Sequence, residues 1–356
     1  MEKLRIAIME GDDIGTEIVP VARDILSKSL QMMDIDIELI ALPIGKLAYE
    51  KYGDTFPNHT ISQLNNVNGI ICGPIGHNNY PRDDPHWKMP PIRKHFELFA
   101  SVRPIKSFNT DRDIDIIFVR EVTEGLQSSE TVVAGYPEFR PNDQITIASR
   151  VITRSGSEKV ARCAFDIANT KNRKKVIAAH KEPIYRLSCG MFLEECVKVA
   201  KEYDDIIFDD SLIDTIAMHL VSRPESFDII VTTNQFGDIL SDIGAGLIGS
   251  IGMAPGLCVG NNLAMAQATH GSAPDISGKN ISNPYAMVIS TAMLLSWMGF
   301  KYKEDKLVNA SNLIEKSAND VIAEKKFITA DIGGKSSTQD MGEEIIRKLE
   351  CNSIEN

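Results

Sequence analysis

Residues 4–30 read LRIAIMEGDDIGTEIVPVARDILSKSL, and this stretch decides the fold class. Its first six residues are short and apolar, as a buried strand is, and GDDIG (11–15) predicts a turn. The remainder places apolar residues at helical spacing. Further runs rich in Ile or Val, such as GIICGPI, KVIAAH and FDIIVTT, recur along the chain. Several precede helical stretches, and such alternation predicts an α/β fold with much parallel sheet.

Two parts of the chain differ from this alternation. Residues 130–154 (ETVVAGYPEFRPNDQITIASRVITR) alternate β-branched and polar residues around Pro, Asn and Asp, which predicts a hairpin-rich insert. The pattern from about residue 286 to residue 350 predicts mainly helix. The apolar run 286–300 is too short to span a bilayer and indicates a buried helix.

Composition narrows the classes of partner. The 356 residues are 43% hydrophobic and carry a net charge of -11, which argues against nucleic acid and against an anionic membrane surface. An anionic substrate would therefore need a local cluster of Arg or Lys. The six cysteines have neither a CxxC nor a zinc-site spacing, and the chain enters a strand-like run almost at once. We therefore expect reduced thiols, no signal peptide and a cytoplasmic location.

The strongest local signal is NQFGDILSDIGAG (234–246), in which two aspartates are four residues apart. On a helix Asp238 and Asp242 share one face and repel each other. A hard divalent cation would remove the repulsion, although a solvated acidic face or a helix cap also fits the spacing. Asp214, in DDSLIDTIAMHLV, is a third candidate ligand.

Cationic residues supply a candidate anion site. Arg93, Arg103 and Arg120 lie near predicted strand or helix ends, where a guanidinium could bind a carboxylate in a bidentate manner or form a surface ion pair. Lys181 follows a strand-like run and could be a desolvated base or a surface lysine. The loop 270–284 is rich in Gly, Ser, Asn and Pro, and could cradle a nucleotide or be an ordinary surface loop.

Taken in order, these pieces resemble the β-decarboxylating dehydrogenase family, which includes isocitrate, 3-isopropylmalate, homoisocitrate, tartrate and D-malate dehydrogenases. GDDIGTE resembles the family's GDGIGPE, FASVRP its YANLRP, REVTEG its RE-TEG motif and HKEPIYRLSCGMF its HK motif. NQFGDILSD and HGSAPDISGKNISNP match almost verbatim. The resemblance covers about residues 4–345.

The resemblance implies an α/β, two-domain isopropylmalate-dehydrogenase-like fold with a doubly wound sheet and a smaller α/β domain. A large, discontinuous, dinucleotide-binding domain would comprise residues 1–97 and 246–356, and a small domain residues 98–245. The insert near 130–150 would be an arm that clasps the partner subunit of a homodimer, or of a higher or hetero-oligomer.

The resemblance also assigns roles to the candidate residues. Arg93, Arg103 and Arg120 would bind substrate carboxylates. Asp214, Asp238 and Asp242 would hold Mg²⁺ or Mn²⁺. Lys181 would help to remove the hydroxyl proton, directly or through Asp214, and in this family both residues come from the second subunit.

The implied cofactor is NAD. It would lie over the loop that begins at residue 270, on His270, Gly271, Ser272, Ala273, Asp275, Ile276 and Asn283. A carboxylate at Asp275 can accept hydrogen bonds from ribose hydroxyls and would repel a 2′-phosphate, which favours NAD over NADP.

The sequence departs from the family pattern at several positions. Gln127 replaces the tyrosine expected to protonate the enol carbon, and an amide is not an acid at neutral pH. Gln267 replaces a glutamate, Asp13 replaces a glycine, and a Glu-Pro pair follows Lys181. One interpretation is an active enzyme with an altered last proton transfer, and the other is a non-catalytic regulatory subunit of a hetero-oligomer. We favour activity, because the three aspartates, the three arginines and the lysine all persist.

The residues before Arg93 bear on the substrate. Met89 and Pro90 stand where isopropylmalate enzymes have apolar residues, which favours a 3-alkylmalate such as 3-isopropylmalate. Lys88 could instead pair with a distal carboxylate of the substrate. The motif TEG (123–125) is the form found in the isocitrate, homoisocitrate and tartrate branches of the family. Isocitrate, homoisocitrate and tartrate or malate therefore stay as alternatives.

Overall fold

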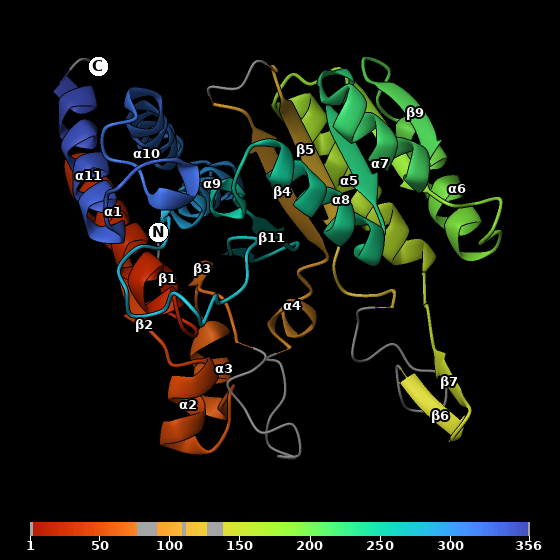
Figure 1. The fold of residues 1–356 in the computed structure, drawn as a ribbon, viewed down its shortest axis with the longest axis horizontal. Coiled ribbons are helices and arrows are strands. Elements are labelled where there is room, and N and C mark those ends of the chain that lie inside the picture. Colours follow the sequence, from red (N-terminus) through yellow and green to blue (C-terminus); the bar gives the residue numbers. More distant parts are fainter. Residues whose placement is uncertain (1–2, 77–90, 109–111, 127–137, 355–356) are drawn as a thin grey trace. The chain divides into compact units, whose positions relative to one another are not determined.

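The structure is a computed structural model, and it describes residues 3–76, 91–108, 112–126 and 138–354. The chain forms two compact units, which are considered separately (Figure 1). The first contains both ends of the chain, Met1–Ile92 and Gly249–Asn356, and the second contains the middle, Arg93–Ile248.

The first unit is built on strands in the order β2-β1-β3-β12-β11. β1 lies between β2 and β3 and is parallel to both, and β12 is parallel to β3 but antiparallel to β11. Three of these strands are buried along their whole length, as expected of apolar strands covered on both faces. The strands are β1 (Leu4–Met9), β2 (Ile37–Ala41), β3 (Gly69–Cys72), β11 (Leu257–Val259) and β12 (Ala264–Ala266).

Helices complete this unit and confirm the helical C-terminal part. α9 has few polar residues and is buried over most of its length, and the hydroxyls of Ser290 and Thr291 bond to carbonyls one turn earlier. It packs against α1 and α10 (Figure 1). The helices are α1 (Gly15–Met32), α2 (Gly45–Tyr52), α3 (Asn58–Leu64), α9 (Tyr285–Tyr302), α10 (Asp305–Glu324) and α11 (Thr338–Ile354), with 3₁₀ turns at Ile251–Met253 and Ala330–Ile332.

The second unit has its own strands in the order β4-β5-β10-β8-β9. β5, β10, β8 and β9 are parallel, and only β4 runs antiparallel to its neighbour β5. The predicted α/β alternation with much parallel sheet is therefore confirmed. The strands are β4 (Ala100–Lys106), β5 (Asp115–Glu121), β8 (Lys175–His180), β9 (Ile207–Leu212) and β10 (Ile229–Thr232).

Helices pack on these strands and on each other. α5 begins after Thr153, whose side chain accepts a hydrogen bond from the Gly156 amide at 3.0 Å and so caps the helix. α5 also packs along α6. The helices are α4 (Ile92–His95, across the unit boundary), α5 (Arg154–Thr170), α6 (Ser188–Ala200), α7 (Ile213–Ser222) and α8 (Asn234–Leu247), with a 3₁₀ turn at Pro224–Ser226.

The predicted hairpin is present in the described part of the insert. β6 (Glu138–Asn142) and β7 (Ile145–Ala148) pair antiparallel as a separate two-stranded sheet. Residues 127–137 lie outside the described residues. The role of the hairpin as a dimer arm stays a prediction.

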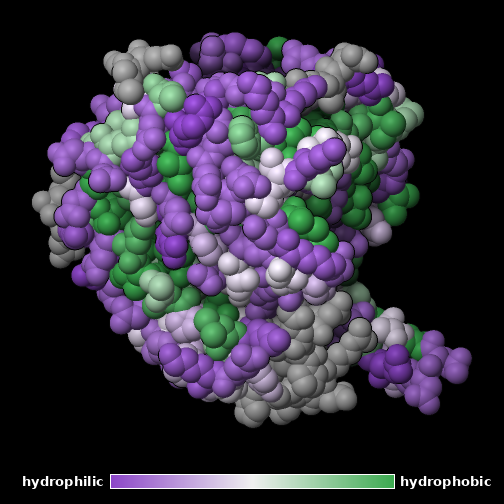
Figure 2. Space-filling model, turned by 60° about the vertical axis from the view of Figure 1, so that its left-hand side comes forward, coloured by the Kyte–Doolittle hydropathy of each residue, from purple (hydrophilic) through white to green (hydrophobic). Residues whose placement is uncertain are grey.

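The surface and the cysteines are those of an ordinary globular chain. All six cysteines are free thiols. The face drawn in Figure 2 is covered mainly by hydrophilic residues. Among the described residues, no helix combines the length and the apolar character needed to cross a membrane.

Candidate active site

Two glycines bring α8 close to the strands of the second unit. A Cβ on Gly237 would lie 2.7 Å from the side chain of Arg120 on β5. A Cβ on Gly244, two turns further on, would lie 2.9 Å from the ring of Phe118. Real side chains do not approach so closely, so only glycine permits this packing. The first turn of α8 is thereby placed against the end of β5.

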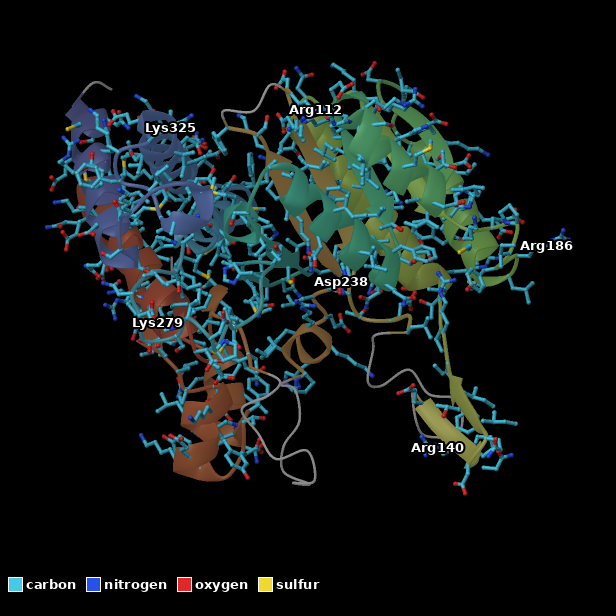
Figure 3. The ribbon with its side chains drawn as sticks, viewed as in Figure 1. Arg112, Arg140, Arg186, Asp238, Lys279 and Lys325 are labelled. Carbon is cyan, nitrogen blue, oxygen red and sulfur yellow. The ribbon has the colours of Figure 1, made fainter. Side chains whose placement is uncertain are left out.

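This close approach builds a cluster of two arginines and one aspartate on α8 (Figure 3 labels Asp238). Arg120 and Arg103 both donate to Oδ1 of Asp238, the latter at 3.4 Å. The side chains of Arg103 and Arg120 are only 4% and 6% exposed, whereas that of Asp238 is 36% exposed. The cluster therefore places two buried positive charges beside a partly accessible carboxylate.

Neutral side chains complete the cluster. Arg120 donates to Oδ1 of Asn234 through Nε at 3.1 Å and through its second terminal nitrogen at 2.6 Å. Arg103 donates to Ser241 at 2.7 Å and to Ser101 at 3.2 Å. These bonds fix the planes of both guanidinium groups, which is the arrangement needed to bind carboxylates with a defined orientation.

Asp242 lies one turn after Asp238, as the spacing predicts. It is exposed, yet the surrounding protein removes part of the water around its carboxylate. This desolvation raises the pKa of Asp242; the nearby Asp238 adds to the rise, and the charges of Arg103 and Arg120 oppose it. A divalent cation between the two carboxylates would relieve both the repulsion and the desolvation.

Two buried glutamates support the loop after β5. Glu121 accepts hydrogen bonds from the amide and the hydroxyl of Thr123, both at 2.6 Å. Glu124 accepts from the amide of Thr153 at 2.9 Å and from its hydroxyl at 2.8 Å, and so ties this loop to the start of α5. Burial raises the pKa of both glutamates.

Lys181 and Asp214 meet beside the carboxyl ends of β8 and β9, and β8 is two strands away from β5 in the same sheet. Lys181 follows β8, and Asp214 is the second residue of α7, which directly follows β9. The Lys181 ammonium donates to Oδ1 of Asp214 at 2.6 Å, and this bond lowers the pKa of the aspartate. The pair is accessible, with the two side chains 25% and 64% exposed. The fold thus brings together Lys181 and Asp214, the two residues that are expected to act jointly.

In the first unit, the loop before α1 and the loop 270–284 are joined directly. The Ile14 amide donates to the carbonyl of Ser272 at 3.1 Å. Glu17 on α1 accepts from the Gly278 amide at 2.5 Å and from the Ser282 hydroxyl at 3.5 Å. The loop before α1 and the loop 270–284, which are separate motifs in the sequence, therefore form one structural element.

Asn283, at the end of this loop, is oriented from both sides. Its amide nitrogen donates to Asp331 at 3.0 Å, and its oxygen accepts from the Tyr285 amide at 2.9 Å. Nε2 of His270 is buried and has no hydrogen-bond partner among the described residues. Burial lowers the pKa of His270, which favours the uncharged form of the ring. An unpartnered ring nitrogen beside a glycine-rich loop fits a position where a bound ligand would form a hydrogen bond.

The remaining predicted residues are distributed as follows. Arg93 lies on α4. Asp13 has φ 50°, a conformation that favours the glycine of the family and that aspartate tolerates. The Gln267 amide donates to the Gly73 carbonyl at 3.5 Å. Gln127 and the substrate candidates Lys88, Met89 and Pro90 lie outside the described residues.

Some residues of the site were not named from the sequence. Asn234 and Glu17 stand inside motifs that were quoted, so the motifs themselves were the available signal. Ser241 also stands inside the quoted NQFGDILSD motif. Asp331 belongs to no such pattern, and only the fold brings it to Asn283. Within the described ranges, no three Asp, Glu, His or Cys side chains of one chain form a metal cluster. Asp214 is therefore not gathered with Asp238 and Asp242 in that part of the chain.

Comparisons with known proteins agree with this geometry. The family model described as isocitrate/isopropylmalate dehydrogenase matches residues 5–345. A homoisocitrate dehydrogenase of Methanocaldococcus jannaschii is 39% identical over 97% of this chain and 98% of its own. A 3-isopropylmalate dehydrogenase of Methanothermobacter thermautotrophicus is 36% identical over 98% of this chain and 100% of its own.

A solved structure gives the same result for the fold. The crystal structure of isocitrate dehydrogenase from Methylococcus capsulatus matches with a TM-score of 0.85 and 35% identity, over 97% of this chain and 99% of that one. The resemblance inferred from the motifs is thereby confirmed. The chain belongs to the isocitrate/isopropylmalate dehydrogenase family and is a dehydrogenase.

Proposed function

We propose that the protein catalyses the NAD-dependent and Mg²⁺- or Mn²⁺-dependent oxidation and decarboxylation of a 2-hydroxy diacid. The observation that carries the proposal is the cluster of Arg103, Arg120 and Asp238. In a chain with a net charge of -11 it supplies the local positive charge that an anionic substrate requires. The family supplies the reaction class.

The metal would be held by Asp238 and Asp242, together with Asp214 of a second copy of the chain. Carboxylate oxygens are the ligands that Mg²⁺ prefers, and the raised pKa of Asp242 marks a position where added positive charge is favourable. When bound, the ion would act as a Lewis acid on the substrate hydroxyl and carboxylate. Arg103 and Arg120, with Arg93, would bind the substrate carboxylates.

NAD would lie on the loop 270–284, with Asp275 accepting from the ribose hydroxyls. The unpartnered Nε2 of His270 and the oriented amide of Asn283 support this assignment. Lys181, directly or through Asp214, would take the hydroxyl proton, and NAD, when bound, would supply the hydride acceptor. Gln127 cannot return a proton to the enol carbon, so water or another group would do so.

We further propose a homodimer with shared active sites. The described part of one chain does not gather Asp214 with the other two aspartates. Large apolar side chains are also exposed on α7 and α8: Met218 57%, Val221 57% and Ile239 54%. A second copy of the chain would cover them and would deliver Lys181 and Asp214.

Mixing two inactive variants tests the shared site. Lys181→Met and Asp242→Asn should each be inactive as homodimers. After denaturation and joint refolding, a mixed dimer would hold one intact site of its two, and half of all dimers would be mixed. About a quarter of wild-type activity should therefore return. No recovery, with mixed dimers present by native mass spectrometry, would place each site within one chain.

For the substrate we propose a 3-alkylmalate, with 3-isopropylmalate first. The apolar Met89 and Pro90 of the sequence support this choice. Homoisocitrate is the second candidate, because a relative of that name is 39% identical to this chain. Isocitrate and tartrate or malate complete the panel.

The test uses purified homomeric protein with Mn²⁺ and NAD, and measures NADH formed from each 2-hydroxy diacid. We expect a higher kcat/KM with 3-isopropylmalate than with isocitrate, and the reverse would overturn the substrate assignment. Mass spectrometry of the product separates oxidation alone from oxidation with loss of CO₂. No NADH from any diacid, even with Gln127→Tyr, would favour the regulatory-subunit interpretation.

A further inference from the structure

His180, the residue before Lys181, forms a pair with Asp210 that the proposed mechanism does not use. β8 and β9 are parallel neighbours, with Ala178 in register with Asp210. Nε2 of His180 lies 2.8 Å from Oδ2 of Asp210. The imidazole is buried, with only 5% of its side chain exposed. A buried polar ring next to the proposed base calls for a physical account.

The contacts of the ring fix its tautomer. The Glu182 amide donates to Nδ1 of His180 at 3.0 Å. A backbone N–H can only donate, so Nδ1 must be the unprotonated nitrogen. Nε2 therefore carries the proton and donates it to the acceptor-only carboxylate of Asp210. Both nitrogens of a neutral imidazole are satisfied, and the carboxylate sets which one accepts.

The bond to Glu182 closes the turn on which Lys181 stands. The amides of Ile184 and Tyr185 donate to the Lys181 carbonyl at 3.1 and 2.9 Å. The imidazole adds a bond that ties this turn back to His180, the last residue of β8. Lys181 leaves the strand at this point, and its ammonium reaches Asp214, 2.6 Å away. His180 and Lys181 are consecutive in the chain. They thus contact Asp210, on the neighbouring strand β9, and Asp214, at the start of α7.

We propose that His180 and Asp210 are positioning residues that direct the Lys181 side chain by fixing the turn after β8. The inference rests on the proposed role of Lys181 in proton removal. Asp210 holds the imidazole in one tautomer, the imidazole holds the Glu182 amide, and the closed turn limits the directions open to Lys181. Residues that orient a reacting group in this way change its rate by about 10- to 100-fold when replaced.

Two conservative variants separate the bonds of the ring. In His180→Asn the amide oxygen can occupy the position of Nδ1 and accept from Glu182, but the side chain is too short for Asp210. In His180→Gln the amide can reach Asp210 but leaves the Glu182 N–H unpaired. We expect His180→Gln to lower kcat about 10-fold or more with KM little changed, and His180→Asn to recover most of it. His59→Asn and His59→Gln, at an exposed histidine of the first unit, are the matched controls.

A second measurement needs no turnover. Amide-resolved hydrogen exchange should show the Glu182 N–H protected in wild type and His180→Asn, and faster in His180→Gln. Equal kcat and equal exchange in wild type and His180→Gln would overturn the inference. So would equal losses in both His180 variants with equal drops in Tm, because that is the result of lost packing alone.

The outcomes also separate this inference from the proposed function. If Lys181→Met is inactive while His180→Gln is fully active, the positioning role fails and the function stands. If the wild type oxidises no diacid, the function fails, and the exchange of Glu182 together with the rate of Lys181 reductive methylation decides the positioning role. Under the inference, both rates rise in His180→Gln and stay unchanged in His180→Asn.

Discussion

The two groups of candidate site residues in the second unit differ in how much of their environment the chain itself provides. In the Arg103–Arg120–Asp238 cluster, the two arginine side chains are buried, at 4% and 6% exposed. Asn234 and Ser241 accept further hydrogen bonds from them. The Lys181–Asp214 pair lies beside the carboxyl ends of β8 and β9 in the same sheet and is more open to water, with side chains 25% and 64% exposed.

The difference teaches which functions each group can perform alone. A buried cation cluster is oriented before any ligand arrives, but removing its carboxylate leaves uncompensated buried charge. An exposed ion pair contributes little to stability, because water screens it. The cluster is therefore both a binding site and a structural element, whereas the pair needs a covering surface before it can act as an acid–base group.

The largest expected effect comes from Asp238→Ala. It removes the carboxylate shared by two buried arginines and should lower the free energy of unfolding by about 3 kcal/mol, besides abolishing activity. Denaturant unfolding without metal measures the first effect. Asp242→Ala, one turn away and exposed, is the control that should lose activity with its stability kept or raised, because the fold disfavours the charged form of this carboxylate. Equal stability of the two variants would mean that the cluster is not structural.

Lys181→Met should lower kcat by about 10²- to 10⁴-fold, the usual loss when a general base is removed, and leave Tm almost unchanged. The measurement is NADH formation with the preferred diacid, alongside a thermal melt. A Tm as low as that of Asp238→Ala would contradict the contrast between the buried arginine cluster and the Lys181–Asp214 pair. Unchanged kcat would remove Lys181 from the mechanism.

The pH dependence of stability at Glu121 tests the same contrast between buried and exposed charged groups. Burial raises its folded-state pKa above the ordinary 4.5, so the fold prefers the protonated form. Its contribution to stability is complete below that ordinary value and is lost as pH rises through the raised folded pKa. Glu121→Gln should therefore gain stability relative to wild type over this window, measured by urea unfolding at several pH values. Glu225→Gln, at an exposed glutamate, is the matched control for the Glu→Gln change.

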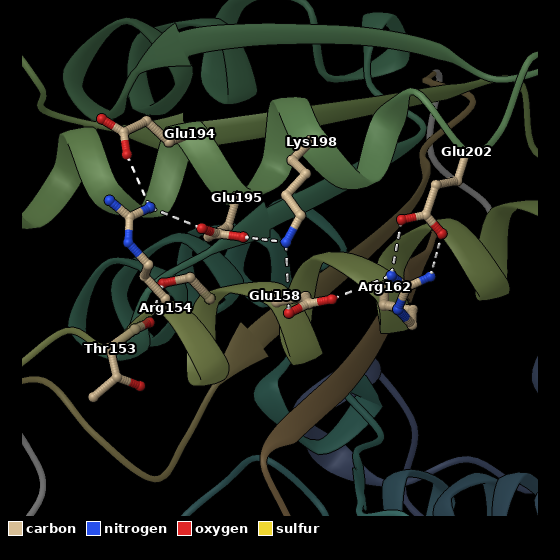
Figure 4. Close-up of polar contacts among 9 residues, drawn as sticks. Thr153, Arg154, Glu158, Arg162, Glu194, Glu195, Lys198 and Glu202 are labelled. Carbon is tan, nitrogen blue, oxygen red and sulfur yellow. Dashed lines mark hydrogen bonds and ion pairs between the residues drawn. The ribbon is translucent and has the colours of Figure 1, made fainter.

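The smallest effect is expected at the surface ion pairs along α5, α6 and the turn that follows α6 (Figure 4). Arg162 bonds to Glu202 at 2.7 Å and to Glu158 at 3.3 Å, all on the surface. Arg162→Gln should lower Tm by no more than about 2–4 °C, and less at high salt, because screening weakens exposed pairs. A larger drop that salt does not reduce would mean that these pairs behave like the buried cluster.

Much of the protein could be predicted from sequence, because the relevant signals are local. Apolar runs and helical spacing predicted β1, α1, β8 and α9, since burial of apolar faces sets these periods. The spacing of Asp238 and Asp242 placed both on one helix. The six ordered motifs identified the family, and the net charge indicated that an anionic substrate would need a local cluster of Arg or Lys.

Other features were decided only by the tertiary structure, because they depend on contacts between residues distant in sequence. Nothing local to Gly237 indicates that its missing Cβ lets Arg120, 117 positions earlier, reach the first turn of α8. Asp331 binds Asn283, and Asp210 fixes the tautomer of His180, only because neighbouring strands and loops meet in the folded chain. The sequence determined which groups carry the chemistry, and the fold decided which of them are buried, oriented or left open to water.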